Sequence, residues 1–256
     1  MFNFGRYISH IPGWLTKNEG SFLYEQAKKC SEKYEIVEIG SWKGRSTVCL
    51  GLGVRDGDGG KVYAVDPHKD TTEHKKWSGK PDAYDTYSIF LANIKNAGID
   101  QYIVPIRSTS EKAAATFKKP IAFIFIDGSH HFSHVKLDYK LWFPKVIQDG
   151  TVAFHDAWHS FGVLTITTFM LLTSTKIRNP RLIDTLIIFQ KLSKNSLIDR
   201  IVNFLFIFYR LFYGWIGSLK MHVLGGTNET STLDKRGILW LKHAYCTIRT
   251  VTFHKS

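Results

Sequence analysis

Four of the five short apolar segments in the middle of the chain end at acidic residues or at glycine-containing turns. These ends are residues 38–40, Asp66, residues 127–128 and the pair His155-Asp156. Carboxylates accept hydrogen bonds from sugar hydroxyls, bind divalent cations and, together with histidine, take protons from a reacting group. The sequence therefore predicts a ligand site with the means to move a proton, assembled from residues that are distant in sequence.

The turn after the first apolar segment, residues 38–47, has the composition of a ligand-binding turn. Gly40 and Gly44 lie four residues apart, and glycine allows the backbone to approach a ligand closely. The turn contains neither the GxGxxG pattern of dinucleotide folds nor the GK[ST] of a P-loop, which disfavours pyrophosphate and triphosphate ligands. Asp66 ends the second segment, where a carboxylate can accept two ribose hydroxyls. A nucleoside ligand without a phosphate tail is the expectation.

The elements that must position these residues are buried strands of a parallel α/β sheet. Five runs rich in β-branched and aromatic residues alternate with segments of helix length, and they span residues 35–40, 61–66, 102–107, 121–127 and 151–156. Pro105 lacks the backbone N–H that a central strand needs, so the third strand is expected at a sheet edge. Ligands of such sheets bind beyond the carboxyl ends of the strands.

The sequence also predicts several helices and a further pair of strands. Thr16 and Glu19 have the spacing of a capping box that opens a helix, and apolar residues recur at helical spacing over residues 87–94 and 135–146. A helix is expected around residues 161–172 and two strands between residues 177 and 192. The long polar stretch 67–86 is expected to be an active-site insertion.

Five ordered blocks of the chain carry a family resemblance. They are GWLTKNEGSFLYEQAKK, VEIGSWKGRST, VYAVDPH, IDGSHHF and LDYKLWFPKVIQDGTVAFHD, and they span roughly residues 13–160. In these blocks the chain resembles class I S-adenosylmethionine-dependent methyltransferases of the methyltransferase domain family 24 group. The resemblance implies a Rossmann-like sheet of order 3-2-1-4-5-7-6 with an antiparallel seventh strand and helices on both faces.

The resemblance also implies roles for individual residues. The cofactor-binding residues would be Glu38, Gly40, Ser41, Gly44 and Ser46 in the first turn, Asp66 at the ribose, Ser108 near the adenine and Asp127 facing the transferred methyl group. One departure is that Trp42 and Lys43 stand where more common methyltransferases have a third glycine. The group that the chain resembles tolerates this variation.

Methyl transfer to a hydroxyl requires removal of its proton, because an alcohol does not ionise unaided at neutral pH. We predict Asp127, His130 and Asp156 as the catalytic residues, with His130 as the base, and rank His131, His155 and His159 below it. Alternatively, Asp127, His155 and Asp156 hold a divalent metal that lowers the pKa of the hydroxyl. Magnesium-dependent relatives have an acid pair at the His155-Asp156 position, and the imidazole moves the preference from magnesium towards manganese or another metal. Both versions, with and without metal, stay open at this stage.

The resulting functional expectation is an enzyme, an S-adenosylmethionine-dependent O-methyltransferase acting on a hydroxyl of a small molecule or sugar. Two alternatives are kept. One is a metal-dependent hydroxylase-like member of the same superfamily, similar to cephalosporin hydroxylases, against which the intact turn at residues 38–46 argues. The other is a catalytically idle, membrane-associated scaffold that keeps the fold.

Composition limits the class of protein further. The 256 residues carry a net charge of +12 and are 44% hydrophobic, which is enough for a core. Three scattered cysteines and the lack of a signal-peptide pattern at the first residues favour a cytoplasmic protein. The basic residues lack the spacing of a nucleic-acid-binding module, so no nucleic-acid partner is expected.

The C-terminal quarter differs from the rest. We divide the chain into a methyltransferase domain, residues 1–192, and a basic, aromatic-rich helical extension, residues 193–256. On a helix, Ser196, Arg200, Asn203, Arg210, Gly214 and Gly217 form a narrow polar stripe that leaves a wide apolar face. This face must be covered by the sheet, by a second copy in a homo-oligomer, or by a membrane lying against residues 197–219.

Overall fold

The computed structural model describes residues 3–57, 60–69, 85–158 and 160–223. Its strands are β1 (Glu35–Ile39), β2 (Val62–Val65), β3 (Ile103–Ile106), β4 (Ile121–Ile126), β5 (Val146–Phe154), β6 (Ile177–Ile183) and β7 (Leu186–Lys191). Its helices are α1 (Phe4–Tyr7), α2 (Lys17–Lys28), α3 (Arg45–Arg55), α5 (Tyr87–Asn96), α6 (Ser110–Thr116), α7 (Phe132–Trp142), α8 (Phe161–Thr173) and α9 (Leu197–Val223). Two short 3-10 helices cover Asp100–Tyr102 and Phe143–Lys145.

The strands form one sheet of order β3-β2-β1-β4-β5-β7-β6. β1 to β5 are parallel neighbours, and β7 pairs antiparallel with both β5 and β6. The predicted Rossmann-like fold and its strand order are therefore confirmed. β3 lies at the edge, where Pro105 pairs with Ala64 and its missing N–H costs the sheet no internal hydrogen bond.

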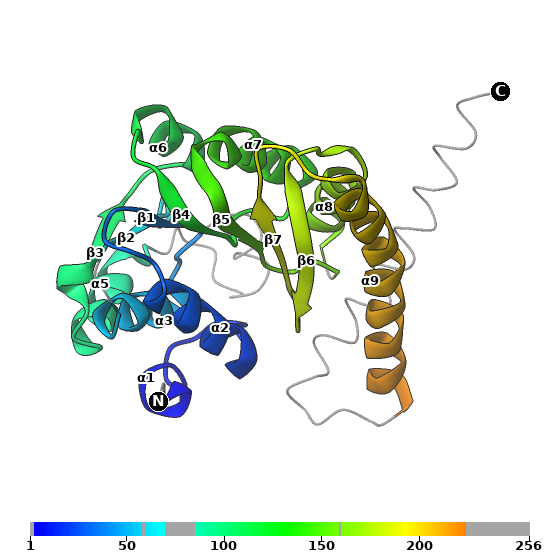
Figure 1. Cartoon of the computed structure of the whole chain (residues 1–256). Coiled ribbons are helices and arrows are strands. Elements are labelled where there is room, and N and C mark those ends of the chain that lie inside the picture. Colours follow the sequence, from blue (N-terminus) through cyan, green and yellow to red (C-terminus); the bar gives the residue numbers. More distant parts are fainter. Residues whose placement is uncertain (1–2, 58–59, 70–84, 159, 224–256) are drawn as a thin grey trace.

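Helices cover both faces of the sheet. In Figure 1, α2, α3 and α5 lie below it and α6, α7 and α8 above it. Because successive strand residues point to opposite faces, Ile36 and Phe123 pack in one core while Val37 and Ile124 pack in the other. This burial on both faces explains why the strand segments read as continuous apolar runs.

The fifth strand differs from its prediction. Residues 135–146 were expected to share one helix, but α7 ends at Trp142 and Val146 already belongs to β5. The register with β4 shifts between the pairs Ile121–Val146 and Phe123–Thr151, so residues 147–150, which include the polar Gln148 and Asp149, lie in an irregularity of the ladder. Their polarity hid this half of the strand from the hydrophobic pattern.

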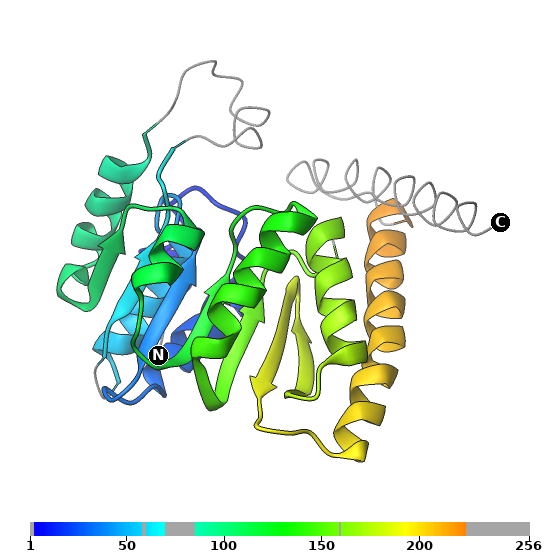
Figure 2. The ribbon, with the colours of Figure 1, turned by 90° about the horizontal axis from the view of Figure 1, so that it is seen from above.

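α9 lies along the outer side of the sheet next to β6 and α8 (Figure 2). Asn203 and Arg210 on this helix are fully buried. Among the described residues, no helix is both long enough and apolar enough to cross a membrane. The division of the chain at residue 192 stays a prediction.

Removal of the Thr16 hydroxyl should destabilise the fold. Thr16 Oγ1 accepts a hydrogen bond from the Glu19 backbone N–H at 3.2 Å and donates one to Asp184 Oδ2 at 2.6 Å, so it closes the predicted capping box and ties α2 to the β6–β7 turn. Thr16→Ala is expected to lower the free energy of unfolding by about 1–2 kcal/mol in urea titrations. Thr109→Ala, which removes the exposed cap of α6, is the matched control and should cost less; an equal loss would contradict the role of the Asp184 contact.

Candidate active site

The turn between β1 and α3 lies very close to the backbone of the turn after β4. Gly40 has φ 90°, and a Cβ placed on it would lie 2.2 Å from the carbonyl oxygen of Asp127. Only glycine fits here, because a side chain would both strain the backbone and collide with the turn after β4. The turn after β1 and the turn after β4 are consequently in direct contact.

Glu38 lies beneath this turn and is completely buried. Its two carboxyl oxygens accept hydrogen bonds from Ser46 Oγ and Thr47 Oγ1, both at 2.5 Å, which fixes the first turn of α3 against β1. Burial, together with the nearby Asp127 and Asp66 carboxylates, raises the pKa of Glu38 to about 8 despite these hydrogen bonds. Glu38 is therefore mostly uncharged at neutral pH.

Asp66, at the end of β2, has both carboxylate oxygens engaged by backbone N–H groups. Oδ2 accepts from Trp42 at 2.8 Å and Oδ1 accepts from His68 at 2.6 Å. Each oxygen has a second lone pair, so the carboxylate can still receive hydroxyl groups. Asp66 thus holds the turn after β1 in shape, a structural role in addition to the predicted ribose contact.

Two buried polar atoms near the carboxyl ends of β1 and β2 lack a hydrogen-bond partner among the described residues. They are Ser41 Oγ, on a residue that is 2% exposed, and His68 Nε2, whose ring bonds Thr86 Oγ1 through Nδ1 at 3.1 Å. Buried polar atoms are seldom left unpaired, so both mark places where a bound molecule would complete the hydrogen bonding. Ser108 follows β3 and is half-buried, with its N–H bonded to Ile106 O at 2.8 Å.

His155 is a buried imidazole enclosed by carboxylates. Its Nε2 lies 3.4 Å from Glu19 Oε2, and its Nδ1 lies 3.2 Å from Asp127 Oδ1 and 3.6 Å from Asp156 Oδ1. Burial lowers the pKa of His155, but Asp127 and Asp156 outweigh it and hold the pKa well above its usual value. His155 is therefore an imidazolium at neutral pH that orients Asp127.

Glu19 completes this buried pair. Its Oε1 accepts hydrogen bonds from the Thr185 N–H at 2.8 Å and the Thr185 hydroxyl at 2.6 Å, and its Oε2 accepts one from the Thr16 N–H at 2.8 Å. Burial raises the pKa of Glu19, but His155 and these donors lower it below the usual value. The capping-box pattern identified Glu19 as a helix residue, and nothing in the sequence indicated that it faces His155.

Asp127, His130 and Asp156 form a cluster at the carboxyl ends of β4 and β5. One side-chain ligand atom from each lies within 4.8 Å of the others, and His130 Nε2 is 3.1 Å from Asp156 Oδ2. Asp156 adopts φ 55°, a left-handed conformation that aspartate tolerates better than most residues. Burial raises the pKa of Asp127, but His155 and His130 lower it below its usual value.

The cluster carries net negative charge. Counted with the buried pair beside it, the carboxylates of Glu19, Asp127 and Asp156 and the imidazolium of His155 leave a formal charge of −2. Such an arrangement can bind a divalent cation or stabilise a protonated His130.

The structure thus brings the three predicted catalytic residues together. Of the predicted metal ligands, Asp127 and Asp156 belong to the cluster, whereas His155 lies behind them with both ring nitrogens directed at carboxylates, and His130 takes the third position. His131, ranked below His130, lies exposed at the start of α7. His159 and residues 70–84 of the predicted insertion lie outside the described residues.

Comparison with known proteins supports the resemblance drawn from the sequence. Residues 37–157 match the family Methyltransf_24, described as a methyltransferase domain. A stretch of 133 residues is 29% identical to the protein y4gI of Sinorhizobium fredii, which covers 50% of this chain but only 14% of that protein. The chain therefore spans about a seventh of the length of this relative.

Solved structures share the fold at low sequence identity. The O-methyltransferase TomG from Streptomyces achromogenes, solved in complex with S-adenosylmethionine, is 12% identical with a TM-score of 0.52, covering 70% of this chain and 82% of that one. An rRNA methylase from Streptococcus thermophilus is 12% identical with a TM-score of 0.50, covering 71% and 100%. Since one fold serves such different acceptors, it does not by itself identify the acceptor.

Protonation of His155 should make stability depend on alkaline pH. Its pKa is higher in the folded than in the unfolded chain, so its contribution is complete below the ordinary histidine pKa and is lost as pH rises through the folded value. As pH rises above the ordinary histidine range, urea unfolding should show a steeper decline in stability for the wild type than for His155→Gln, which keeps only the decline that comes from the raised pKa of Glu38. The exposed His131→Gln should retain the steeper decline, and identical pH profiles for the wild type and His155→Gln would contradict the assignment.

Proposed function

We propose that the class I S-adenosylmethionine-dependent methyltransferase domain of this chain transfers a methyl group to a hydroxyl of a small-molecule or sugar acceptor. One observation carries the proposal. The turn after β1, which would hold the cofactor, touches the turn after β4 at Gly40 and Asp127, and this second turn begins the Asp127–His130–Asp156 cluster. A cofactor in the first turn would therefore lie beside groups that can take a proton.

The residues of the first turn fit S-adenosylmethionine. Ser41 Oγ is a buried hydroxyl without a partner among the described residues, and Asp66 has lone pairs left for ribose hydroxyls. The cofactor supplies a methyl group on a positively charged sulfur. The uncharged Glu38 supports this turn from below without adding a further negative charge.

We further propose that Asp127, His130 and Asp156 hold a divalent cation. Two carboxylates and one imidazole suit manganese or iron better than magnesium, and the formal charge of −2 favours a cation. Such a cation would supply a lowered pKa for a hydroxyl bound to it. His155 positions Asp127, and Glu19 holds His155, so the proton-accepting groups are fixed before the acceptor arrives.

The choice of a hydroxyl acceptor rests on this cluster and on neighbours such as TomG, which is named an O-methyltransferase. A hydroxylase of the same superfamily could use a similar cluster but would not need S-adenosylmethionine, and an idle scaffold would bind no metal here. Cofactor binding, metal binding and turnover together separate these functions.

Ser41→Ala should weaken S-adenosylmethionine binding while leaving the fold intact. The variant removes a hydroxyl that has no partner among the described residues, so its stability should be unchanged or slightly higher. Loss of one hydrogen bond to the cofactor corresponds to roughly 2- to 13-fold in affinity by calorimetry. Thr173→Ala, at the exposed end of α8, is the control, and an unchanged dissociation constant for Ser41→Ala would remove Ser41 from the cofactor site.

Asp156→Asn should weaken binding of Mn²⁺ by about tenfold or more, because it removes one of two anionic ligands. Calorimetry with Mn²⁺ alone tests this without knowledge of the acceptor. Asp149→Asn is the matched control, since Asp149 lies on β5, the strand before Asp156, and is 55% exposed and paired with Arg178. If the wild type does not bind Mn²⁺, or Asp156→Asn binds it like the wild type, the cluster does not hold the cation and His130 becomes the expected base, with activity that survives a chelator.

A further inference from the structure

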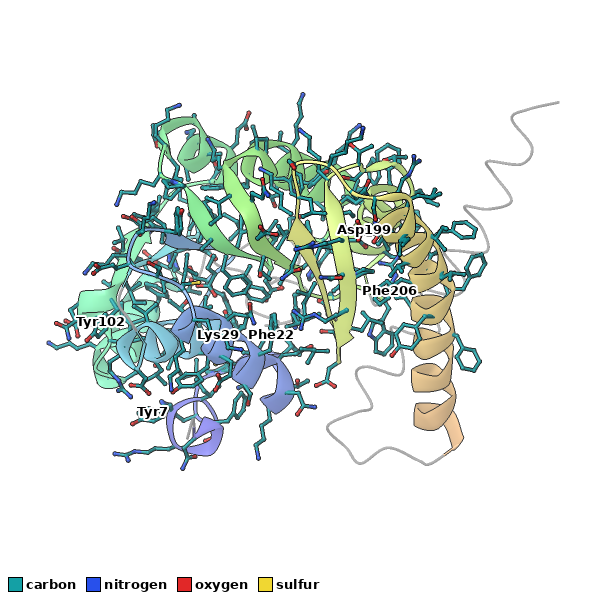
Figure 3. The ribbon with its side chains drawn as sticks, viewed as in Figure 1. Tyr7, Phe22, Lys29, Tyr102, Asp199 and Phe206 are labelled. Carbon is teal, nitrogen blue, oxygen red and sulfur yellow. The ribbon has the colours of Figure 1, made fainter. Side chains whose placement is uncertain are left out.

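α9 presents its apolar face away from the protein. Ten of its side chains are large, apolar and between 44% and 73% exposed: Leu197, Ile198, Ile201, Val202, Phe204, Leu205, Phe208, Tyr209, Leu211 and Phe212. Figure 3 shows side chains extending from the outer side of this helix, whereas the labelled Phe206 points towards the sheet. Globular proteins rarely leave so continuous an apolar surface in contact with water.

Two residues of the polar stripe, Asn203 and Arg210, face inward instead. Asn203 Nδ2 donates to Ile177 O at 3.0 Å, and Arg210 donates to Thr167 Oγ1 at 2.6 Å, to Leu164 O at 3.3 Å and to Thr168 Oγ1. Burial lowers the pKa of Arg210 to about 10. These bonds to β6 and α8 fix the rotation of the helix, so the apolar face cannot turn inward without leaving buried polar groups unpaired.

The exposed face is too broad for one packed partner. At about 100° per residue, the positions from Leu211 to Val202 cover about half of the helix circumference. An ordinary helix buries an apolar stripe about 100° wide. A fluid lipid layer can cover the whole arc, whereas a single helix of a second copy would cover only part of it.

The neighbouring helix α8 also exposes apolar side chains. α8, which packs beside α9, exposes Phe169 by 60% and Leu172 by 49%. Figure 2 shows α9 at the outer margin of the molecule with no element beyond it among the described residues.

The charge of the chain favours an anionic surface as the partner of the apolar face of α9. The chain has a net charge of +12, so two copies repel each other, whereas an anionic surface attracts both. Lys194 and Arg200 are exposed at the start of α9, and Asp199 is the only acidic residue within the helix. Basic side chains at the margin of an apolar helix face can reach lipid headgroups.

We propose that α9 is a membrane-docking helix that lies in the plane of an anionic lipid surface with its outer face at the boundary between headgroups and acyl chains. Ile201, Leu205, Phe208 and Phe212 form the centre of the face. This binding is peripheral, since the helix is anchored to the sheet along its other side by Asn203 and Arg210. It is independent of the methyl-transfer reaction.

Vesicle sedimentation of the full chain tests the proposal. The protein should sediment with vesicles of phosphatidylcholine and phosphatidylglycerol, less with phosphatidylcholine alone, and less at high salt. The double variant Leu205→Glu and Phe208→Glu should reduce the partition coefficient by about tenfold or more, because charges replace two inserted side chains. Both residues are more than half exposed, so circular dichroism and the unfolding midpoint should be unchanged.

Leu91→Glu is the matched control. Leu91 is a partly exposed apolar residue of α5, beyond the opposite edge of the sheet, and its substitution should leave vesicle binding intact. Light scattering after size exclusion measures the oligomeric state in parallel. A wild-type dimer that ignores vesicles and dissociates in the double variant would overturn the proposal in favour of a second copy. A monomer that ignores vesicles, or equal vesicle binding by the wild type and the double variant, would also overturn it.

Discussion

The candidate active site depends on one buried charge interaction, the imidazolium of His155 held between Glu19 and the Asp127–Asp156 pair. It joins α2, near the N-terminus, to the ends of β4 and β5. Without the imidazolium, two or three carboxylates would share a buried region and would repel one another. The positive charge keeps Asp127 ionised and leaves its remaining lone pairs directed at the cluster. The cluster is therefore preorganised by a residue that need not touch the substrate.

The sequence predicted the sheet because burial on both faces requires continuous apolar strands, and it predicted the edge position of β3 because of Pro105. It also located the polar groups, since parallel strands place their carboxyl ends at one edge. It placed His130 with the two aspartates, as the structure does, but it did not predict that His155 points inward to Glu19. Adjacent residues at a strand end differ in direction only through local backbone angles, such as the left-handed conformation of Asp156, and these leave no periodic signal. The polar half of β5 was missed for a related reason, because an irregular ladder has no alternation.

The C-terminal helix shows the limit of arguments from amphipathicity. Its pattern correctly separated a narrow polar stripe from a wide apolar face, but a pattern does not say which side faces the protein. The structure turns Asn203 and Arg210 of this stripe inward, where they donate hydrogen bonds to carbonyl and hydroxyl oxygens on β6 and α8. Directed hydrogen bonds therefore decided the rotation, although the apolar face is much larger.

Gly214 brings α9 close to the segment that follows β5. The residue lies on α9 against Trp158, where a Cβ placed on the glycine would lie 3.6 Å from Trp158 Cβ, and Trp158 Nε1 donates to Asp184 O at 3.0 Å. Trp158 is two residues from Asp156, so a short path of packed atoms, rather than a flexible tether, separates the outer helix from the catalytic cluster. Any surface on which α9 rests would then lie at a fixed distance from the Asp127–His130–Asp156 cluster, and the fold would set that distance.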